Sequence, residues 1–380
     1  MRYFEVAFLL FTLVLAGAAP PAPAGHVRTY YIAADEVRWN YAPSGMNETM
    51  GRPFDAIERV YTVQTPHRIG PVYWKAVYRE YTDATFRKLK PRPANQRYLG
   101  ILGPIIHAEV GDTIKVIFKN NATRPYSIHP HGVLYAKSSE GVAYNDDTSA
   151  ASKVGGAVPP GHIYTYIWQV PERAGPGPGD PSSVVWLYHS HTDDQKDVDS
   201  GLVGAIIVTA RGMARADGTP KDVDREFVTL FQMFNENQSW YLDRNLREYA
   251  PAVTRKERDE VIGVDPEGNF ALTGMGFADS NFKWSINGYL YGNGPKMVMK
   301  RGARVRWYVV DMGNGFNFHT PHWHGNTVLL NHRHTDVISL GPAQMVTADM
   351  VPDNPGIWLY HCHVSDHMRA GMSALYQVLP

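Results

Sequence analysis

Cysteine is almost absent from this sequence: Cys362 is the only one among 380 residues. A single cysteine cannot form a disulfide within its own chain, so the stability of the fold has to come from packed cores. A lone cysteine is often a buried, inert side chain. That interpretation leaves the histidines on both sides of Cys362 unexplained.

An excess of charge is absent as well. Lysine plus arginine number 37 and aspartate plus glutamate also number 37, so the formal net charge is zero. A chain with balanced charge lacks the electrostatic footprint of a protein that binds nucleic acid or an anionic membrane. We therefore expect neither of them as the main partner.

Long apolar runs are missing outside the N-terminus. Residues 1–24 combine an early Arg2, an apolar run from Val6 to Leu15 and small residues after it, which predicts a cleaved signal peptide. The run is short for a membrane span, and a retained N-terminal anchor is the alternative. We expect the mature chain to be secreted or periplasmic, with no membrane span after cleavage.

Metal-ligating side chains are concentrated around the cysteine. Cys362 lies between His361 and His363, and a further histidine and a methionine follow. Two imidazoles, one thiolate and a weak thioether are the ligand set of blue-copper electron-transfer sites. With a histidine from an earlier motif the set is complete, and it consists of His319, Cys362, His367 and Met372.

Alternation along the same segment separates two roles. If residues 357–363 are extended, the Cys362 side chain faces one side while His361 and His363 face the other. One short segment then contacts two sites. The covalent link from the thiolate to the flanking imidazoles is a ready route for electrons.

The second site is indicated by repeated His-x-His motifs. Two motifs in the first half of the chain recur in the second half, and a Trp-Leu-Tyr triplet precedes the last motif of each half. The chain is therefore an internal duplication. Its eight imidazoles are enough for three coppers with open positions for oxygen, and they are His129, His131, His189, His191, His322, His324, His361 and His363.

The first copy lacks a blue-copper site of its own. Each of the four ligand positions carries another residue there: Tyr126 for His319, Ser190 for Cys362, Gln195 for His367 and Leu202 for Met372. The first half keeps its share of the cluster, and only the second half can accept electrons at a thiolate site.

Runs of β-branched and aromatic residues predict strands in both halves. These runs are 29–32, 113–118, 163–170, 203–208, 226–234, 305–310, 327–330 and 373–378. A Gly- and Pro-containing segment, 211–221, predicts a linker, and the charged run 254–260 predicts a solvated loop or short helix. The fold class is therefore all-β, with two sandwich units.

The four His-x-His motifs and the His-Cys-His-x3-His-x4-Met run resemble the multicopper oxidases. Framework segments such as 77–83, 98–106 and 239–242 resemble the ceruloplasmin and hephaestin branch, and the similarity covers nearly the whole mature chain. The resemblance implies two Greek-key cupredoxin-like β-sandwich domains, as in the two-domain small laccases. Residues 25–211 would hold half of a trinuclear copper cluster and no type 1 copper, and residues 222–380 would hold the type 1 copper and the other half.

Position by position, the resemblance implies four coppers per functional unit. The ligands would be His319, Cys362, His367 and Met372 for type 1 copper, His129 and His322 for type 2, and His131, His189, His191, His324, His361 and His363 for the type 3 pair. It also implies that a small reducing substrate is oxidised at type 1 copper. Electrons would then pass through Cys362 to His361 and His363 and reduce O2 to water.

Each half of the chain supplies four cluster imidazoles, so the cluster must lie between unlike halves, either within one chain or between neighbours. A contact between unlike surfaces that repeats around an axis closes into a ring. The two-domain relatives form homotrimers with clusters between subunits. We therefore expect a homotrimer.

The reducing substrate is left open by the residues around the predicted type 1 site. Asp279 and Asp366 match carboxylates that bind iron(II) in ferroxidase relatives, or they are a loop cap and a surface charge. Trp284 and Gly315 replace two further iron ligands, which weakens the ferroxidase interpretation. A phenolic compound, iron(II) and copper(I) all remain candidate donors.

Two other functions are compatible with parts of this pattern. A copper nitrite reductase also uses two cupredoxin domains and a trimer, but its type 2 copper needs only three histidines, so the eight cluster imidazoles count against it. A catalytically silent scaffold would not need the intact ligand set.

Overall fold

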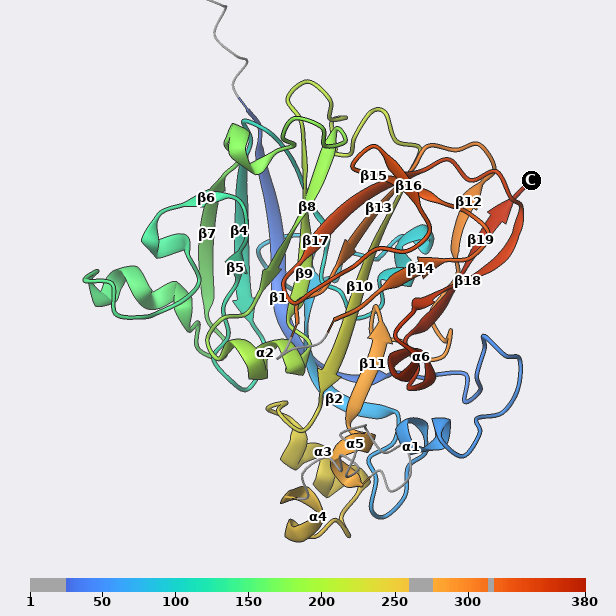
Figure 1. The fold of residues 1–380 in the computed structure, drawn as a ribbon. Helices are drawn as coiled ribbons and strands as arrows, with labels where there is room; N and C mark the ends of the chain where they lie inside the picture. The colour runs from blue at the N-terminus through green and yellow to red at the C-terminus, as the bar shows by residue number, and fades with distance from the viewer. Residues whose placement is uncertain (1–24, 260–275, 314–317) are drawn as a thin grey trace, which may run out of the picture.

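A computed structural model describes residues 25–259, 276–313 and 318–380 (Figure 1). The predicted signal peptide, residues 1–24, lies outside the described residues, as does Gly315. None of the described helices is long and apolar enough to span a membrane.

The first half of the chain forms two sheets around one core. One sheet has the order β2-β1-β4-β7-β6, from Val72–Glu80, Val27–Asn40, Thr113–Asn120, Ile163–Gln169 and Leu134–Tyr135. The other has the order β3-β9-β8-β5, from Ile106–Glu109, Val203–Thr209, Ser183–His189 and His129–Pro130. Buried side chains from both sheets pack into a single apolar cluster, which makes the unit a β-sandwich.

The second half repeats this arrangement. A six-stranded sheet has the order β11-β10-β13-β17-β15-β16, from Phe282–Ile286, Arg225–Asn235, Val305–Val310, Met345–Met350, Val328–Leu330 and Arg333–Thr335. A four-stranded sheet has the order β12-β19-β18-β14, from Met297–Lys300, Ser373–Leu379, Gly356–Cys362 and Pro321–Trp323. In both halves the four-stranded sheet begins with a parallel pair, β3 with β9 and β12 with β19. The duplication seen in the motifs is therefore also a duplication of topology.

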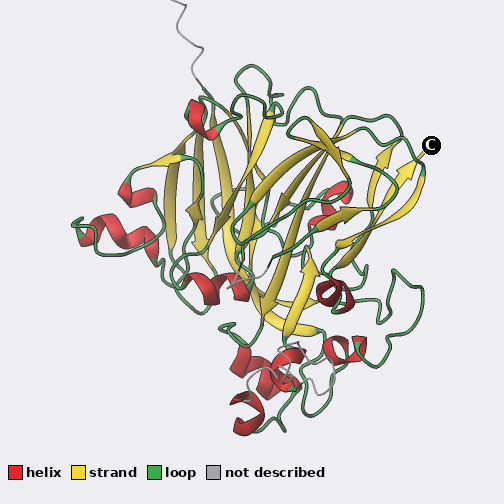
Figure 2. Cartoon of the chain, in the orientation of Figure 1, coloured by secondary structure: helices red, strands yellow, loops and turns green. Residues whose placement is uncertain are grey.

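Helices are short and lie in the segments that connect the strands (Figure 2). The α-helices are α1 (Glu58–Thr62), α2 (Asp194–Ser200), α3 (Leu242–Tyr249), α4 (Arg255–Asp259), α5 (Phe277–Ser280) and α6 (Ser365–Arg369). The 3-10 helices are η1 (Ala94–Leu99), η2 (Lys137–Ser139), η3 (Ala150–Gly156) and η4 (Glu172–Ala174). Because α2 and α6 follow the last His-x-His motif of each half, they occupy equivalent places in the two sandwiches.

The prediction of two cupredoxin-like β-sandwich domains is confirmed, and each predicted strand run overlaps an observed strand. The largest difference is β1, which was expected over 29–32 and extends over Val27–Asn40. Ala33, Ala34 and Asp35 have weak strand propensity, but they pair with β2 on one side, and the two alanines also pair with β4 on the other. Tertiary pairing therefore overrides local preference.

The two sandwiches share an apolar interface. Leu187 and Val203 of the first half are fully buried in the same cluster as Phe231 and Tyr360 of the second. Such a continuous core fixes the orientation of the two halves more firmly than the connecting segment could.

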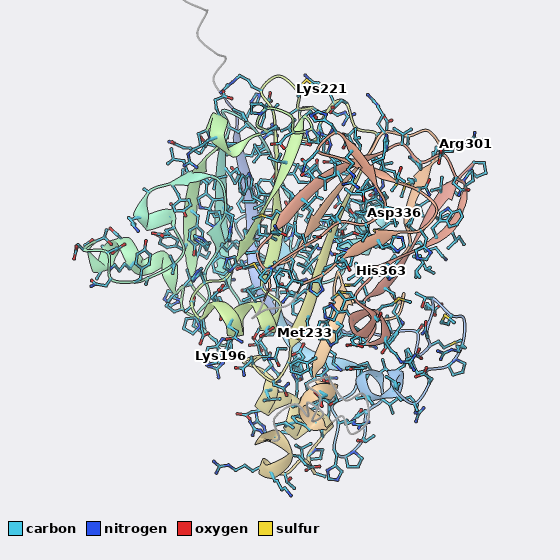
Figure 3. All side chains as sticks on the ribbon, in the orientation of Figure 1. Lys196, Lys221, Met233, Arg301, Asp336 and His363 are labelled. Carbon is cyan, nitrogen blue, oxygen red and sulfur yellow. The ribbon has the colours of Figure 1, made fainter. Side chains whose placement is uncertain are left out.

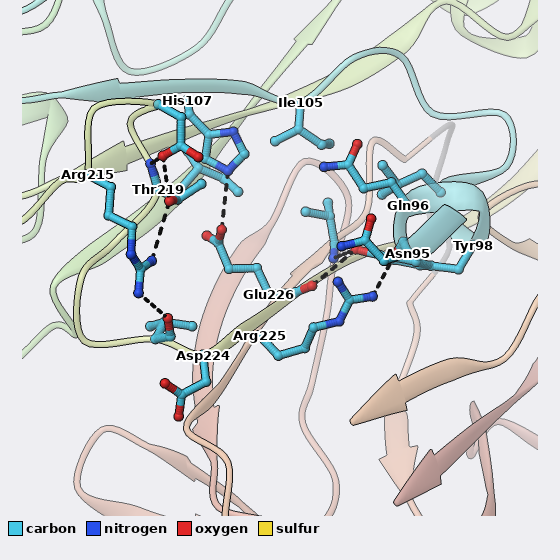
Figure 4. A pocket seen from close by; sticks show the side chains of 15 residues that line it. Asn95, Gln96, Tyr98, Ile105, His107, Arg215, Thr219, Asp224, Arg225 and Glu226 are labelled. Carbon is cyan, nitrogen blue, oxygen red and sulfur yellow. Dashed lines mark hydrogen bonds and ion pairs between the residues drawn. The ribbon is translucent and has the colours of Figure 1, made fainter. Parts of the chain in front are cut away.

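The connecting segment, predicted as a linker, is a tight turn closed by a bridge between Ala214 and Pro220. Beside it a polar pocket of about 260 Å³ opens between the two halves (Figure 4). In this pocket the His107 Nε2 atom lies 3.4 Å from the Glu226 carboxylate, and Arg225 donates to the Asn95 carbonyl oxygen. None of the eight motif histidines lines it, so it is separate from the metal-ligating residues.

Candidate metal centres

The first centre joins the cysteine with two histidines from different elements. Cys362 ends β18, His319 precedes β14 and His367 lies in α6. The Cys362 Sγ atom is 3.6 Å from His367 Nδ1 and 3.9 Å from His319 Nδ1, and the two Nδ1 atoms are 3.2 Å apart. Three metal-ligating atoms therefore converge on one point.

Strand pairing brings these side chains together. Residue Pro321 of β14 is opposite Cys362 of β18, so His319 comes close to the thiol. The chain then turns through α6 and returns, and the Cys362 N–H donates to the Met372 carbonyl oxygen at 3.1 Å. The return needs Gly371 at φ +121°, a conformation that favours glycine. Met372 is fully buried beside this site.

The chemistry of the donors fits a soft metal ion. Burial lowers the pKa of His319 to about 3 and of His367 to about 4, so both rings are neutral near pH 7 and each has a lone pair to donate. Burial also raises the pKa of the Cys362 thiol, and a bound cation would be needed to keep the thiolate there. Two imidazoles and a thiolate are the donors that copper prefers.

The first-half histidines form a second group. His129 begins β5 and His189 ends β8, where the two residues are paired directly opposite each other. The Nε2 atoms of His131 and His189 are 3.2 Å apart, and the ring centroids of His129 and His191 are 5.2 Å apart. All four predicted imidazoles of the first half are therefore brought together.

The second-half histidines form an equivalent group. The Nε2 atoms of His324 and His361 are 3.0 Å apart, and His322 Nδ1 is 3.2 Å from His361 Nε2. The ring centroids of His322 and His363 are 5.2 Å apart. His361 and His363 flank Cys362 in sequence, but their rings belong to this group and not to the group around the buried Cys362, as the alternation predicted.

Backbone carbonyls determine which ring nitrogens are free. The Nδ1 atoms of His129, His189 and His361 lie 2.7 to 3.0 Å from carbonyl oxygens. A carbonyl oxygen only accepts, so each Nδ1 carries the proton and each Nε2 keeps its lone pair for a metal. Burial also lowers the pKa of His129 and of His361 to about 4, which keeps these rings neutral.

The two imidazole groups stay apart within the chain. Among the residues that the structure describes, no hydrogen bond or ring contact joins a first-half motif histidine to a second-half one. His189 and His361 are buried, the other six motif histidines are only partly covered or exposed, and the exposed His363 is labelled in Figure 3. The described residues therefore form two separate groups of candidate metal ligands, one in each half.

In the first half, hydrogen-bonded side chains fill the place of the cysteine site. The Ser190 hydroxyl donates to Asp197 Oδ2 at 2.6 Å, and the Trp240 indole N–H donates to Asp197 Oδ1 at 2.9 Å. The Tyr126 hydroxyl lies 3.3 Å from that of Tyr241, and Leu202 is fully buried. Tyr126, Ser190 and Leu202 offer a copper ion neither an imidazole, a thiolate nor a thioether.

Two carboxylates that the sequence analysis did not single out contact the imidazole groups. An Asp194 oxygen lies 2.9 Å from His189 Nδ1, and an Asp336 oxygen lies 3.6 Å from His322 Nε2. Asp194 follows its motif closely in sequence, which was the one available signal. Asp336 is brought in by a bridge between His322 and Val337, which sequence spacing does not reveal.

The two predicted substrate carboxylates both act on the Tyr61 hydroxyl. Asp279 is half-buried in α5, where burial raises its pKa, and Asp366 is exposed in α6. Burial raises the pKa of the Tyr61 hydroxyl, and the negative charges of Asp279 and Asp366 raise it further. The two carboxylates therefore share Tyr61 as a neighbour.

Two cupredoxin-like sandwiches that carry a thiolate-imidazole site beside paired His-x-His motifs define a class of copper oxidases. Comparison with protein families agrees: two sequence profiles described as "Multicopper oxidase" match residues 92–212 and 263–380. The chain belongs to the multicopper oxidase family.

The similar curated proteins are longer than this chain. Human "Ferroxidase HEPHL1" is 42% identical over 374 residues, covering 98% of this chain and 30% of the relative. Mouse hephaestin is 40% identical over 375 residues, covering 97% of this chain and 31% of the relative. Human ceruloplasmin is 40% identical over 357 residues, with coverage of 93% and 31%. The chain thus spans about a third of these relatives.

Solved structures share the fold at low sequence identity. A multicopper oxidase crystal structure has a TM-score of 0.56 and 18% identity, covering 93% of this chain and 89% of the other. A copper nitrite reductase from Nitrosomonas europaea has a TM-score of 0.56 and 15% identity, covering 93% and 94%. Because both kinds of enzyme match equally well, these likenesses show the fold alone.

Proposed function

We propose that this protein couples the one-electron oxidation of a small reducing substrate to the four-electron reduction of O2 to water. The observation that carries the proposal is the double role of β18. The end of this strand holds Cys362 in the thiolate group and His361 in an imidazole group, and the ring of His363, the residue after the strand, lies against His322 of the same imidazole group. The candidate donors are phenolic compounds and metal ions such as iron(II) or copper(I), and the relatives named as ferroxidases favour iron(II) among the metals.

Copper is the cofactor that these donors fit, and when bound it supplies reversible one-electron chemistry and open positions for O2. We assign type 1 copper to His319, Cys362, His367 and Met372, type 2 to His129 and His322, and the type 3 pair to His131, His189, His191, His324, His361 and His363. The functional unit then holds four coppers. The protein's part is to hold neutral imidazoles in fixed tautomers and to keep the thiolate site dry.

Oxygen uptake by the copper-loaded full chain tests the function. With a phenol, iron(II) or copper(I) as donor, we expect O2 consumption with four one-electron donors oxidised per O2. Release of nitric oxide from nitrite without O2 consumption would instead identify a nitrite reductase. A protein that binds no copper at neutral pH would be a silent scaffold.

We further propose a homotrimer in which the first-half group of one subunit meets the second-half group of the next. The separation of the two groups within one chain supports this arrangement, because either group alone is an incomplete ligand set. A contact between unlike surfaces gives a ring when its rotation closes, and a trimer is such a ring.

Complementation between two inactive variants tests this assembly. One variant carries His131→Ala and His189→Ala, and the other carries His324→Ala and His361→Ala. Co-expressed chains regain O2 uptake if the clusters lie between subunits, because some interfaces then pair two intact groups. If each cluster lies within one chain, co-expression restores nothing.

For localisation we propose a secreted or periplasmic mature protein that has lost residues 1–24. N-terminal sequencing of protein recovered from the periplasm or the medium tests this proposal. A mature chain that retains Met1 would favour an N-terminal anchor.

A further inference from the structure

An indole ring covers the thiolate site. Trp284, on β11, stacks on the His367 imidazole with ring centroids 3.9 Å apart and an interplanar angle of 25°. Its edge also faces the His319 ring at 6.3 Å and 81°. One side chain therefore contacts both imidazoles that converge on Cys362.

The position of this indole is held by the strand that carries it. Trp284 is opposite Met233 in the antiparallel pair of β11 with β10 (Met233 is labelled in Figure 3). The neighbouring Lys283 is fully buried on the other face, where its ammonium donates to the carbonyl oxygens of Tyr61, Gly70 and Ser280 at 2.7 to 2.9 Å. A lysine anchored in this way fixes the register of β11, and with it the face on which the indole lies.

The indole also links the site to the surface. Cys362 and His319 are 0% and 1% exposed, whereas Trp284 is only partly buried. The two stacked rings, the indole of Trp284 and the partly buried imidazole of His367, therefore lie between solvent and the buried thiol. Short contacts between stacked rings are suited to electron transfer without movement of the protein.

The chemistry of this surface favours one class of donor. An indole offers a single N–H donor and no lone pair for a hard cation. Its ring instead attracts planar aromatic molecules by stacking. The indole itself gives a hydrated metal ion no ligand, whereas a phenol finds an aromatic partner there, so a metal donor would depend on the carboxylates of Asp279 and Asp366.

We propose that Trp284 is the contact residue for aromatic donors, phenols and aromatic amines, and that it makes this chain select them over hydrated metal ions. The inference rests on the proposed oxidase function and names its substrate class. In each step a phenol loses one electron and its hydroxyl proton and becomes a phenoxyl radical. With copper bound at the site, the electron would cross the indole and His367 and reduce Cu(II) to Cu(I), and the proton would leave to solvent.

Anaerobic mixing with a single donor tests this selectivity. The bleaching rate of the blue band is followed with a phenol and with iron(II) in the wild type, Trp284→Phe, Trp284→Leu and Trp74→Leu. Trp74 is a matched control, since this first-half indole is also partly buried and lies under the Arg244 guanidinium. It packs on the first-half core, which does not contain Cys362. From the usual strength of an aromatic pair we expect Trp284→Leu to slow the phenol by about threefold to tenfold. Iron(II) should not slow, and Trp284→Phe and Trp74→Leu should stay near the wild type.

Binding to the copper-free protein gives a readout that does not depend on oxidation. Phenol should shift the indole N–H resonance of Trp284 in the NMR spectrum, with the assignment made from Trp284→Phe. The inference is overturned if phenol leaves that resonance in place, or if Trp284→Leu keeps its blue band and an unchanged ratio of phenol to iron(II) rates. If Trp284→Leu loses the blue band, the inference is tested instead by the phenol rate of Trp284→Phe and by the shift of the Trp284 N–H resonance. A resonance shift in a protein that oxidises no donor would disprove the proposed function but would still support Trp284 as a binding contact for phenols.

Discussion

At the scale of single residues, the most telling side chain is Cys362, because it belongs to one centre while its two neighbours belong to another. Its thiol is fully buried and receives the Thr320 N–H at 3.3 Å. The flanking rings of His361 and His363 face their own group with centroids 5.8 Å apart. Removing the sulfur should therefore affect one centre and leave the ligands of the other in place.

Cys362→Ser is expected to abolish the blue absorption and the oxidation of every donor, because a hydroxyl does not replace a thiolate as a copper ligand. The imidazole groups should still load copper. Metal analysis together with the visible and EPR spectra checks both points. Retained turnover would disprove the route through Cys362.

A second residue-scale prediction concerns Asp194, whose carboxylate lies 2.9 Å from His189 Nδ1. A carboxylate in this position orients the ring and makes it a better donor, and removing such a partner commonly costs about 10- to 100-fold in metal affinity. Asp194→Asn should therefore weaken copper binding by the first-half group, as measured by competition with a chelator. Asp336→Asn is the comparison: its oxygen is more distant from its histidine, at 3.6 Å, so the loss should be smaller.

At the scale of elements, a buried ion pair joins the two sandwiches. Lys75 of β2 and Glu236, just after β10, are both 0% exposed and form a hydrogen-bonded salt bridge. Tyr41 donates to the same carboxylate at 2.6 Å, and the Lys75 ammonium also donates to the Asp199 carbonyl oxygen at 2.8 Å. Glu236 thus joins residues of the first half to the start of a second-half loop.

Lys75→Met should lower the free energy of unfolding by about 3–5 kcal/mol, because it leaves the Glu236 carboxylate buried without its cation. Denaturant titration measures the loss. The double variant Lys75→Met, Glu236→Gln should recover much of it, since no charge is then left uncompensated. A single variant as stable as the wild type would show that this pair is not needed at the interface.

The elements also show where sequence reasoning reached its limit. The roles of the strand end at Cys362 were predictable because successive side chains of a strand face opposite sides, and the alternation of His361, Cys362 and His363 is visible in the sequence. The short strands β5 and β14, which carry first-half and second-half histidines, contain two and three residues and exist only through pairing with β8 and β18. Likewise, sequence comparison marked Trp284 only as a missing ligand, and its stacking on His367 depends on two elements far apart in the chain.

At the scale of the whole molecule, the metal-ligating histidines affect the acid stability of the copper-free protein. Burial lowers the pKa of His129, His131, His361 and His367 to about 4 and that of His319 to about 3. In the unfolded chain these rings titrate near about 6.5. At pH values between the folded and unfolded pKa, the rings are protonated in the unfolded chain and neutral in the folded chain.

The free energy of unfolding of the copper-free protein should therefore fall as pH drops from about 6.5 towards about 4, and it should change little from this source above about 7. Denaturant midpoints at a series of pH values measure the effect. Copper-loaded protein is the comparison, because acid must also displace the metal there. A midpoint that stays constant between pH 7 and pH 5 would contradict the burial of these rings as neutral groups.

The two roles of β18 also limit how this protein can change by insertion or deletion. Removing one residue before Tyr360 would exchange the two faces of the strand end, turning the imidazoles towards the core and the thiol towards the cluster. Both centres would be lost in a single event. Length changes should therefore be tolerated in exposed loops between strands, such as 177–180, while this strand can vary only by substitution.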